Sequence, residues 1–273
     1  MQVREIDAYG GAALITGASS GIGEAYARRL AAEGMDLVLV ARRADRLEKL
    51  ARELRSASGI TVHVVPQDLM DRDGPRLVFD AVDRLGIEIG VLVSNAGFGT
   101  YGRFIDQDPE LQLQIPEVNN RAAVGLAAIL APRLVERGRG AMIFLSSTAA
   151  YQPVAFEAVY GASKAFNLMF GEALWAELAE HGIDVIVLSP GFTPTEYQRK
   201  AGMGEPQPIT GWTSPEQVVD ASLRGLGRRS SVVPGWRNRV VIFLMRILTR
   251  RAAARLTYRV NKPADRSGSA TAD

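Results

Sequence analysis

Residues 12–23 read AALITGASSGIG, an apolar run that passes directly into a glycine-rich turn. The apolar part, Ala12–Thr16, shows no polar alternation, which is typical of a strand buried on both faces. Glycine permits a tight turn and lets the main chain approach a ligand closely. The free amides of a helix N-terminus favour phosphate. The stretch therefore predicts a strand, a turn and a helix that bind a dinucleotide through Gly17, Ser19, Ser20, Gly21, Ile22 and Gly23.

The glycine spacing here is Gly-x-x-x-Gly-x-Gly, whereas the commoner dinucleotide fingerprint is Gly-x-Gly-x-x-Gly. A glycine cluster can also be only a turn. Its place between the first strand and the first helix favours the phosphate interpretation.

Short apolar runs and longer helical patterns alternate through the following residues. Further strands are expected at 36–41, 61–66, 90–94, 141–146 and 183–189, and helices at 21–33, 45–56, 74–84, 109–137 and 158–181. Such alternation predicts right-handed strand–helix–strand units and one α/β domain, a doubly wound parallel sheet with helices on both faces. We expect this domain to span 1–235 and to include a Gly/Pro/Thr-rich substrate loop at 190–213, followed by a distinct segment at 236–262 and a disordered tail at 263–273.

Composition narrows the classes of function. The chain has 273 residues, 47% of them hydrophobic and 23% charged, as in an ordinary globular protein. It has no cysteine, which excludes disulfides, thiolate metal sites and cysteine nucleophiles. His63 and His181 have no metal-ligand spacing, and we expect structural roles for both. There is no export signal and no apolar run of membrane-spanning length, so the cytoplasm is the expected compartment.

The segment 236–262 is strongly basic. It carries no acidic residue and eight cations, namely Arg237, Arg239, Arg246, Arg250, Arg251, Arg255, Arg259 and Lys262. Residues 240–245 are apolar throughout. This combination fits peripheral contact with an anionic membrane surface, but also packing against the substrate loop or against another subunit. Nucleic acid is not an expected partner, because the segment lacks a recognisable motif and stacking aromatics.

The end of the second strand bears on the choice of cofactor. An acidic residue there would select NAD by binding a ribose hydroxyl. This chain instead has Ala41-Arg42-Arg43, and two guanidiniums match a 2′-phosphate. We therefore expect NADP(H) rather than NAD(H), with Arg42 the stronger candidate and Arg43 the second. The arginines could instead only solvate the next helix, and Asp45 keeps dual specificity open.

Tyr160 and Lys164 are one helical turn apart, and Ser147 follows a predicted strand. An ammonium beside a phenol favours phenolate, so Lys164 is expected to lower the pKa of Tyr160. Ser147 can hydrogen-bond a substrate oxygen whose charge changes. A second Tyr-x-x-x-Lys, Tyr258 to Lys262, lacks the serine and the glycine turn, and we interpret it as accidental.

Together these motifs resemble those of the short-chain dehydrogenase/reductase family: the glycine turn, Asn95-Ala96-Gly97, Ser147, and Tyr160 with Lys164. The resemblance covers about residues 12–195. It implies a Rossmann-type fold, NAD(P)(H), and a Ser-Tyr-Lys site extended by an asparagine. That asparagine corresponds to Asn119, although the adjacent Asn120 is the alternative. Further cofactor contacts implied by the resemblance are Asp68, Leu69, Asn95, Ala96, Gly97, Pro190, Gly191 and Thr195, besides Tyr160 and Lys164.

The family resemblance is strongest to NADPH-using 3-oxoacyl and ketone reductases. It implies hydride transfer between the cofactor and a ketone, aldehyde or alcohol on an apolar or acyl-chain-like substrate. Expected pocket residues are Phe98, Tyr101, Tyr151 and Phe156. The family's usual pairing through residues 109–137 and 158–181 implies a homodimer or homotetramer. The alternatives are a non-catalytic NADP(H)-binding regulator and a membrane-associated interaction protein.

Overall fold

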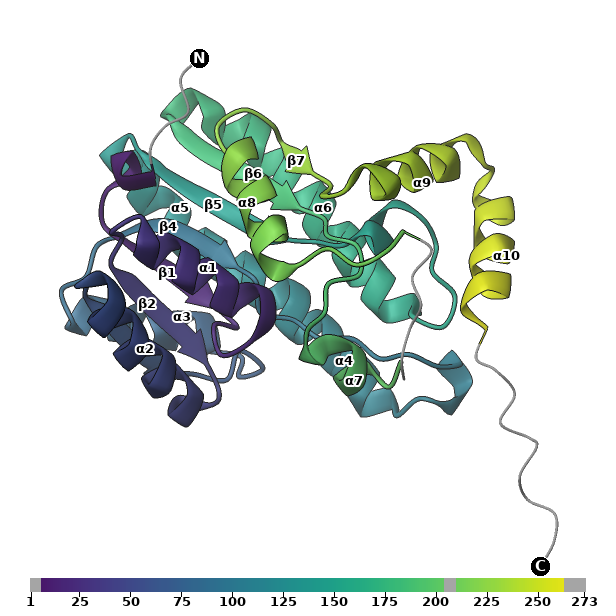
Figure 1. Cartoon of the computed structure of the whole chain (residues 1–273), viewed down its shortest axis with the longest axis horizontal. Helices are drawn as coiled ribbons and strands as arrows, with labels where there is room; N and C mark the ends of the chain where they lie inside the picture. Colours follow the sequence, from purple (N-terminus) through teal and green to yellow (C-terminus); the bar gives the residue numbers. More distant parts are fainter. Residues whose placement is uncertain (1–5, 204–209, 263–273) are drawn as a thin grey trace, which may run out of the picture.

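The structure is a computed structural model that describes residues 6–203 and 210–262. The tail expected at 263–273, and part of the loop expected at 190–213, lie outside these residues. Within them a parallel sheet runs in the order β3-β2-β1-β4-β5-β6-β7 (Figure 1). Its strands are β1 (Ala12–Thr16), β2 (Leu37–Ala41), β3 (Val62–Pro66), β4 (Ile89–Ser94), β5 (Gly140–Leu145), β6 (Ile183–Leu188) and β7 (Ser231–Val232).

Helices cover both faces of this sheet. They are α1 (Gly21–Ala32), α2 (Ala44–Ser58), α3 (Gly74–Arg84), α4 (Pro109–Pro116), α5 (Ala122–Arg137), α6 (Ala158–Leu178), α7 (Glu196–Ala201), α8 (Pro215–Gly225), α9 (Trp236–Ile247) and α10 (Arg250–Asn261). Successive residues of β1 enter different cores, as the period of a strand requires. Ala13 and Ile15 pack with α1, α2 and α8, whereas Ala12 and Leu14 pack with α3, α5 and α6. The expected doubly wound fold is therefore confirmed.

The long helix expected at 109–137 is interrupted. Asp108 caps α4 by accepting a hydrogen bond from the amide of Glu110, and α4 ends at Pro116. A π-helical turn, Glu117–Arg121, follows before α5 begins. Such wide turns place one extra residue in the helix and occur frequently at functional sites. This turn carries Asn119, whose side chain is buried.

The C-terminal segment forms two helices beside the sheet domain rather than an extension of it (Figure 1). The inner face of α10 is anchored to the core through buried Ala253 and Thr257. The Thr257 hydroxyl donates to the carbonyl of Pro153 at 2.9 Å. The outer face of both helices is exposed and apolar in part, as described below. Among the described residues, no helix combines the length and the hydropathy that crossing a bilayer requires.

Short 3₁₀ turns complete the elements: Ile6–Tyr9, Phe104–Asp106, Thr148–Tyr151 and Ala179–His181. His181 ends its turn immediately before Gly182, which has φ 75° as expected of a residue that closes a helix. His63 lies on β3. The part of the chain that the structure describes contains no cluster of metal-binding side chains.

Candidate active site

A cleft of about 680 Å³ opens at the carboxyl ends of the strands, where ligands bind in open α/β sheets. Every residue that the sequence proposed for cofactor or catalysis lines this cleft, apart from Gly23 and Asn119. These two lie in the layer that supports its wall. Residues far apart in the sequence, such as Gly17 and Thr195, thus line the same cleft.

The glycine turn is packed against the strand ends. A methyl group added to Gly23 would lie 2.3 Å from the carbonyl oxygen of Gly17, so only glycine fits there. Asn95 fastens the turn to β4, because its Nδ2 donates to the carbonyl of Thr16 at 2.8 Å. The Thr16 hydroxyl in turn accepts the amide of Ala96 at 3.0 Å. Gly21 and Ile22 of the first turn of α1 line the cleft, which is where a helix N-terminus could bind an anion.

Three polar side chains meet on the opposite wall. Ser147, Tyr160 and Lys164 all line the cleft, and the Ser147 hydroxyl is close enough to the phenol to lower the pKa of Tyr160 in part. Lys164 Nζ is 5.8 Å from the centre of the Tyr160 ring and donates to the carbonyl of Leu145 at 3.0 Å. The neighbouring Ser146 turns away and donates to the carbonyl of Lys164 at 2.7 Å. The geometry therefore favours Ser147 over Ser146 as the hydroxyl available to a substrate.

The pKa of Tyr160 is raised rather than lowered as expected, and Lys164 is not among the groups that shift it. The pKa of Tyr160 is raised to about 12, chiefly by burial and also by the carboxylate of Glu157, and hydrogen bonding to Ser147 and Tyr197 only partly offsets this. The ammonium is itself poorly solvated, since burial lowers the pKa of Lys164 to about 8. Tyr160 is consequently protonated at neutral pH, the form that can donate a proton.

Asn119 joins the π turn to both walls of the cleft. Its Oδ1 accepts the amide of Phe98 at 2.9 Å, and its Nδ2 donates to the carbonyl of Phe98 and to the hydroxyl of Ser163, each at 2.9 Å. Asn120 donates to the carbonyl of Ser163 at 2.8 Å and faces Asn167 instead. Of the two candidates, Asn119 is the one tied to the cleft wall.

The carboxyl group of Glu157, which no sequence motif marks, lies near the phenol of Tyr160. Tyr197, on α7, stacks near Tyr160 with ring centres 5.2 Å apart, and its hydroxyl donates to Glu157 Oε1 at 3.3 Å. Burial raises the pKa of Glu157 to about 7. Glu157 lies three residues before Tyr160, but Tyr197 approaches from 40 residues away. No local pattern could have predicted this contact.

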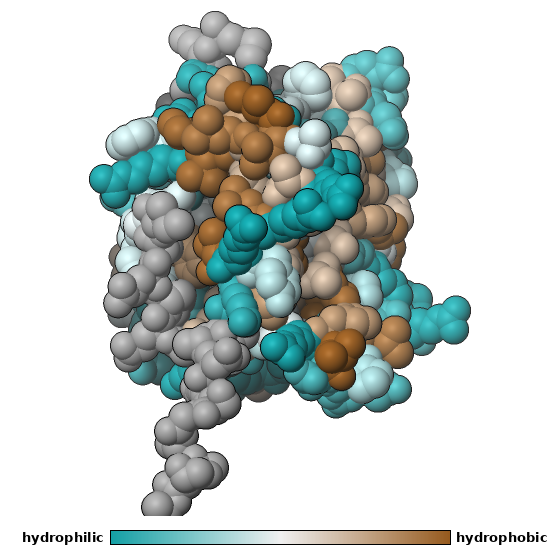
Figure 2. Space-filling model, turned by 90° about the vertical axis from the view of Figure 1, so that its right-hand side faces the viewer, coloured by the Kyte–Doolittle hydropathy of each residue, from teal (hydrophilic) through white to brown (hydrophobic). Residues whose placement is uncertain are grey.

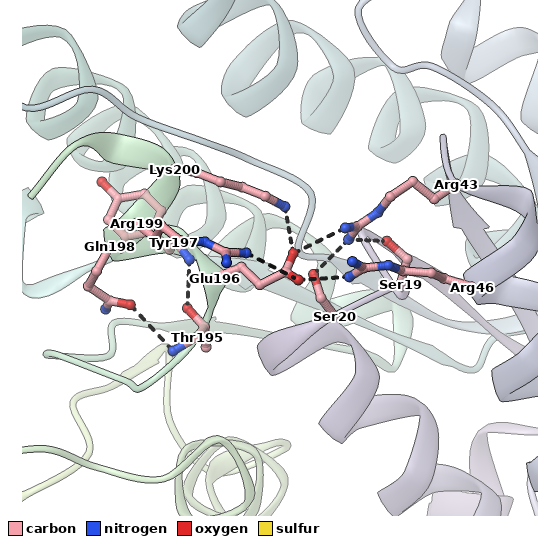
Figure 3. Close-up of polar contacts among 10 residues, drawn as sticks. All are labelled: Ser19, Ser20, Arg43, Arg46, Thr195, Glu196, Tyr197, Gln198, Arg199 and Lys200. Carbon is pink, nitrogen blue, oxygen red and sulfur yellow. Dashed lines mark hydrogen bonds and ion pairs between the residues drawn. The ribbon is translucent and has the colours of Figure 1, made fainter. Parts of the chain in front are cut away.

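The adenosine end of the cleft is basic. Arg43 Nη2 donates to the hydroxyls of Ser19 and Ser20 at 2.9 and 3.0 Å. Arg42, in contrast, is largely exposed and lies 3.8 Å from the carboxylate of Asp68. Of the two arginines, Arg43 is therefore the one directed at the glycine turn. It also reaches Glu196 of α7, which the sequence analysis did not single out (Figure 3).

Three of the aromatic residues expected in the pocket lie elsewhere. Phe98 lines the cleft, whereas Tyr101, Tyr151 and Phe156 do not. Phe156 packs between Tyr101 and Tyr258, with ring centres 6.3 and 5.2 Å away, and so forms the seat of α10. This also accounts for Tyr258, the first residue of the second Tyr-x-x-x-Lys, which serves packing.

Comparison with known proteins agrees with this geometry. The family model described as "short chain dehydrogenase" matches residues 11–206. The chain belongs to the short-chain dehydrogenase family. This short-chain dehydrogenase is 32% identical to the 7beta-hydroxysteroid dehydrogenase of Clostridium sardiniense over 85% of this chain and 88% of the relative. It is 31% identical to the very-long-chain 3-oxoacyl-CoA reductase of Anas platyrhynchos, over 80% and 69% respectively.

Solved structures give the same result. A structure concerning 7beta-hydroxysteroid dehydrogenase stereoselectivity superposes with a TM-score of 0.84 at 29% identity, covering 94% of this chain and 99% of the other. The short-chain dehydrogenase of Sphingobium yanoikuyae in complex with NADPH gives 0.76 at 33% identity, covering 96% and 100%. This short-chain dehydrogenase is therefore an oxidoreductase that interconverts carbonyl and alcohol groups.

Proposed function

We propose that this enzyme uses NADP(H) to reduce the carbonyl of an apolar ketone or aldehyde, with Ser147, Tyr160 and Lys164 as its catalytic residues and Asn119 as their support. The observation that carries the proposal is that Ser147, Tyr160 and Lys164 line the same cleft as the glycine turn. A non-catalytic regulator would not need Ser147, Tyr160 and Lys164 together in the cofactor cleft.

The side chains suit proton delivery. When bound, the nicotinamide supplies the hydride. Tyr160, protonated at neutral pH, donates its proton to the substrate oxygen. Ser147 donates a hydrogen bond to the same oxygen, where negative charge develops. Lys164, with a pKa near 8, can then reprotonate the phenol, and Asn119 holds the cleft wall against α6.

The cofactor fits the residues present. Gly17 and Gly23 pack too closely for any side chain, and the first turn of α1 lines the cleft, where its amides would hold a pyrophosphate. Arg43, fixed by Ser19 and Ser20, supplies a planar cation for a 2′-phosphate. Arg42 and Asp68 line the same end, at the position of the adenine ring in this interpretation. Similar solved structures in complex with NADPH support the choice of NADP(H).

The substrate end of the cleft is largely apolar, with Phe98, Leu111, Val118, Phe192 and Met203 among its lining residues. This favours an acyl chain or a fused-ring skeleton over a sugar. The relatives named for hydroxysteroids, for 3-oxoacyl-CoA and for bulky ketones support the same class.

A screen of NADPH oxidation across fatty 3-ketones, steroid ketones, quinones and small aldehydes tests this function. We expect the larger apolar ketones to be reduced fastest, with NADH a poorer donor. Failure of every carbonyl compound, despite NADPH binding measured by fluorescence, would favour the regulator.

We also propose that α9 rests on the anionic cytoplasmic face of a membrane, so that the enzyme is cytoplasmic and peripheral. Figure 2 shows apolar side chains gathered on the face that α9 and α10 form. Trp236, Phe243 and Ile247 are each exposed by at least 64%. The arginines beside them suit lipid phosphate. Phe243→Ser should reduce co-sedimentation with anionic vesicles; equal binding by both proteins would dismiss this contact.

Finally, we propose that two copies pair through α4, α5 and α6. This interpretation is supported by exposed apolar side chains on α6, where Phe166, Met169 and Trp175 are 45%, 63% and 40% exposed, and by Leu113 of α4 at 61%. Exposed aromatics clustered in this way mark interaction sites. Met169→Glu should shift the mass measured by light scattering towards that of a monomer.

A further inference from the structure

One carboxylate lies at the centre of the basic end of the cleft. Glu196 Oε2 is 3.1 Å from Arg43 Nη1 and 2.7 Å from Lys200 Nζ, and its Oε1 is 2.8 Å from Arg46 Nη1 (Figure 3). The side chain of Glu196 is only 25% exposed. The contacts join α7, which covers the substrate end, to α2 and the glycine turn. They are therefore not a local helix pair but a tie across the cleft.

The charges of this cluster do not balance. Three cations surround one carboxylate at hydrogen-bond distance, and Arg199 lies at 3.9 Å from it. A phosphate monoester carries about 1.5 to 2 negative charges at neutral pH and three acceptor oxygens, so it matches these donors better than a carboxylate does. Like charges repel, and the N–H groups that hold Glu196 cannot at the same time hold a phosphate. Phosphate and Glu196 must exchange.

The contacts of Arg43 also show that a phosphate and Glu196 would compete for the same donors. One of its terminal nitrogens is committed to Ser19 and Ser20 of the glycine turn, and the other to Glu196. The guanidinium is thus already oriented as a planar fork over the turn, with a carboxylate on the side that faces into the cleft. Arg46 presents its Nη1 to the same carboxylate from the first turn of α2.

We propose that Glu196 is an internal competitor for the 2′-phosphate of NADP(H), and that Arg43, Arg46 and Lys200 form the phosphate seat from which it is displaced. The inference rests on the proposed use of NADP(H). Binding of the phosphorylated cofactor then releases α7 from α2. NADH, which has no 2′-phosphate, leaves the tie in place. Glu196 in this way sets the affinity for NADP(H) and couples cofactor binding to the position of the helix that carries Tyr197.

The variant Glu196→Gln tests this assignment, because glutamine keeps the shape and one acceptor but removes the charge. Dissociation constants for NADPH, NADH and adenosine 2′-monophosphate are measured by calorimetry for this variant and for the wild type. We expect NADPH and adenosine 2′-monophosphate to bind about three- to tenfold more tightly to the variant, as loss of a partly exposed ion-pair competitor allows. NADH binding should change by less than about twofold.

Asp83→Asn is the matched control. Asp83 pairs with Arg133 through two hydrogen bonds on the surface, and neither residue lines the cleft. It removes the same charge without touching the seat, so NADPH binding should be unchanged. A gain equal to that of Glu196→Gln would reduce the effect to net charge and overturn the proposal.

Hydrogen exchange gives a second measurement that does not depend on turnover. In protein without added nucleotide, the amides of α7 should exchange faster in Glu196→Gln than in the wild type. Unchanged or weaker NADPH binding by the variant, or an equal gain for NADH, would refute the competitor role. Failure of the wild type to bind NADPH at all would instead refute the proposed function, so the two failures are distinguishable.

Discussion

Replacing Glu157 by glutamine should stabilise the protein at alkaline pH and leave it unchanged at acid pH. Burial raises the pKa of this carboxyl from an ordinary 4.5 to about 7 in the folded protein. Below pH 4.5 the group is protonated in both the folded and the unfolded chain, so it does not affect the free energy of unfolding. Between pH 4.5 and about pH 7 the folded chain binds more protons at Glu157 than the unfolded chain does, so the free energy of unfolding falls as pH rises.

The size of the effect follows from the pKa. Because one pKa unit corresponds to about 1.4 kcal/mol, a rise from 4.5 to about 7 costs at most about 3 kcal/mol of stability above pH 7. Water in the cleft reduces this cost, so we expect Glu157→Gln to gain about 1 to 3 kcal/mol at pH 8.5 and nothing at pH 4.5. Glutamine retains an acceptor for the hydroxyl of Tyr197. The gain in stability therefore comes from removing the negative charge of Glu157 and not from losing this hydrogen bond.

Urea denaturation at several pH values measures this difference. Glu53→Gln is the control, because the hydrogen bond from Arg28 lowers the pKa of Glu53, so neutralising it should destabilise the protein at neutral pH. The charge of Glu157 also raises the pKa of Tyr160, so the alkaline limb of kcat/KM should move to lower pH in Glu157→Gln. A stability gain that stays constant from pH 4.5 to 8.5 would refute the reasoning.

Two further predictions concern the catalytic and cofactor ends of the cleft. Ser147→Ala should lower kcat by about 10²- to 10³-fold in steady-state assays, because the substrate oxygen loses a hydrogen-bond donor. A loss below about fivefold would assign Ser147 a structural role. Gly23→Ala should weaken NADPH binding at least about tenfold while circular dichroism stays near wild type, because the added methyl meets the carbonyl of Gly17 at 2.3 Å and displaces the turn. Unchanged affinity would mean that the turn does not contact the cofactor.

Much of the fold could be predicted from the sequence, because buried parallel strands are unbroken apolar runs. Ala12–Thr16 agrees to the residue with β1, and Gly74–Arg84 with α3. β7 was missed because Ser231–Val232 is only two residues long and has no pattern of its own. The π turn after Pro116 was missed because it interrupts a continuous helical periodicity.

The site was predicted where its residues stand in motifs and missed where contacts are distant. Tyr160, Lys164 and Ser147 have a fixed spacing, so the sequence alone could group them. Glu196 meets Arg43 across 153 positions, and nothing local marks that pairing. Which of Arg42 and Arg43 reaches the glycine turn likewise depends on the backbone direction after β2, which the sequence does not specify. The pKa of Tyr160 was misjudged because burial of the phenol and the nearby carboxylate of Glu157 both raise it, and the sequence shows neither.

The most direct test of the account is Tyr160→Phe, which removes one hydroxyl and keeps the ring packed against Tyr197. We expect carbonyl reduction to fall to background while the dissociation constant for NADPH stays near that of the wild type. Near-normal turnover in this variant would remove Tyr160 from the chemistry and contradict the proposed mechanism.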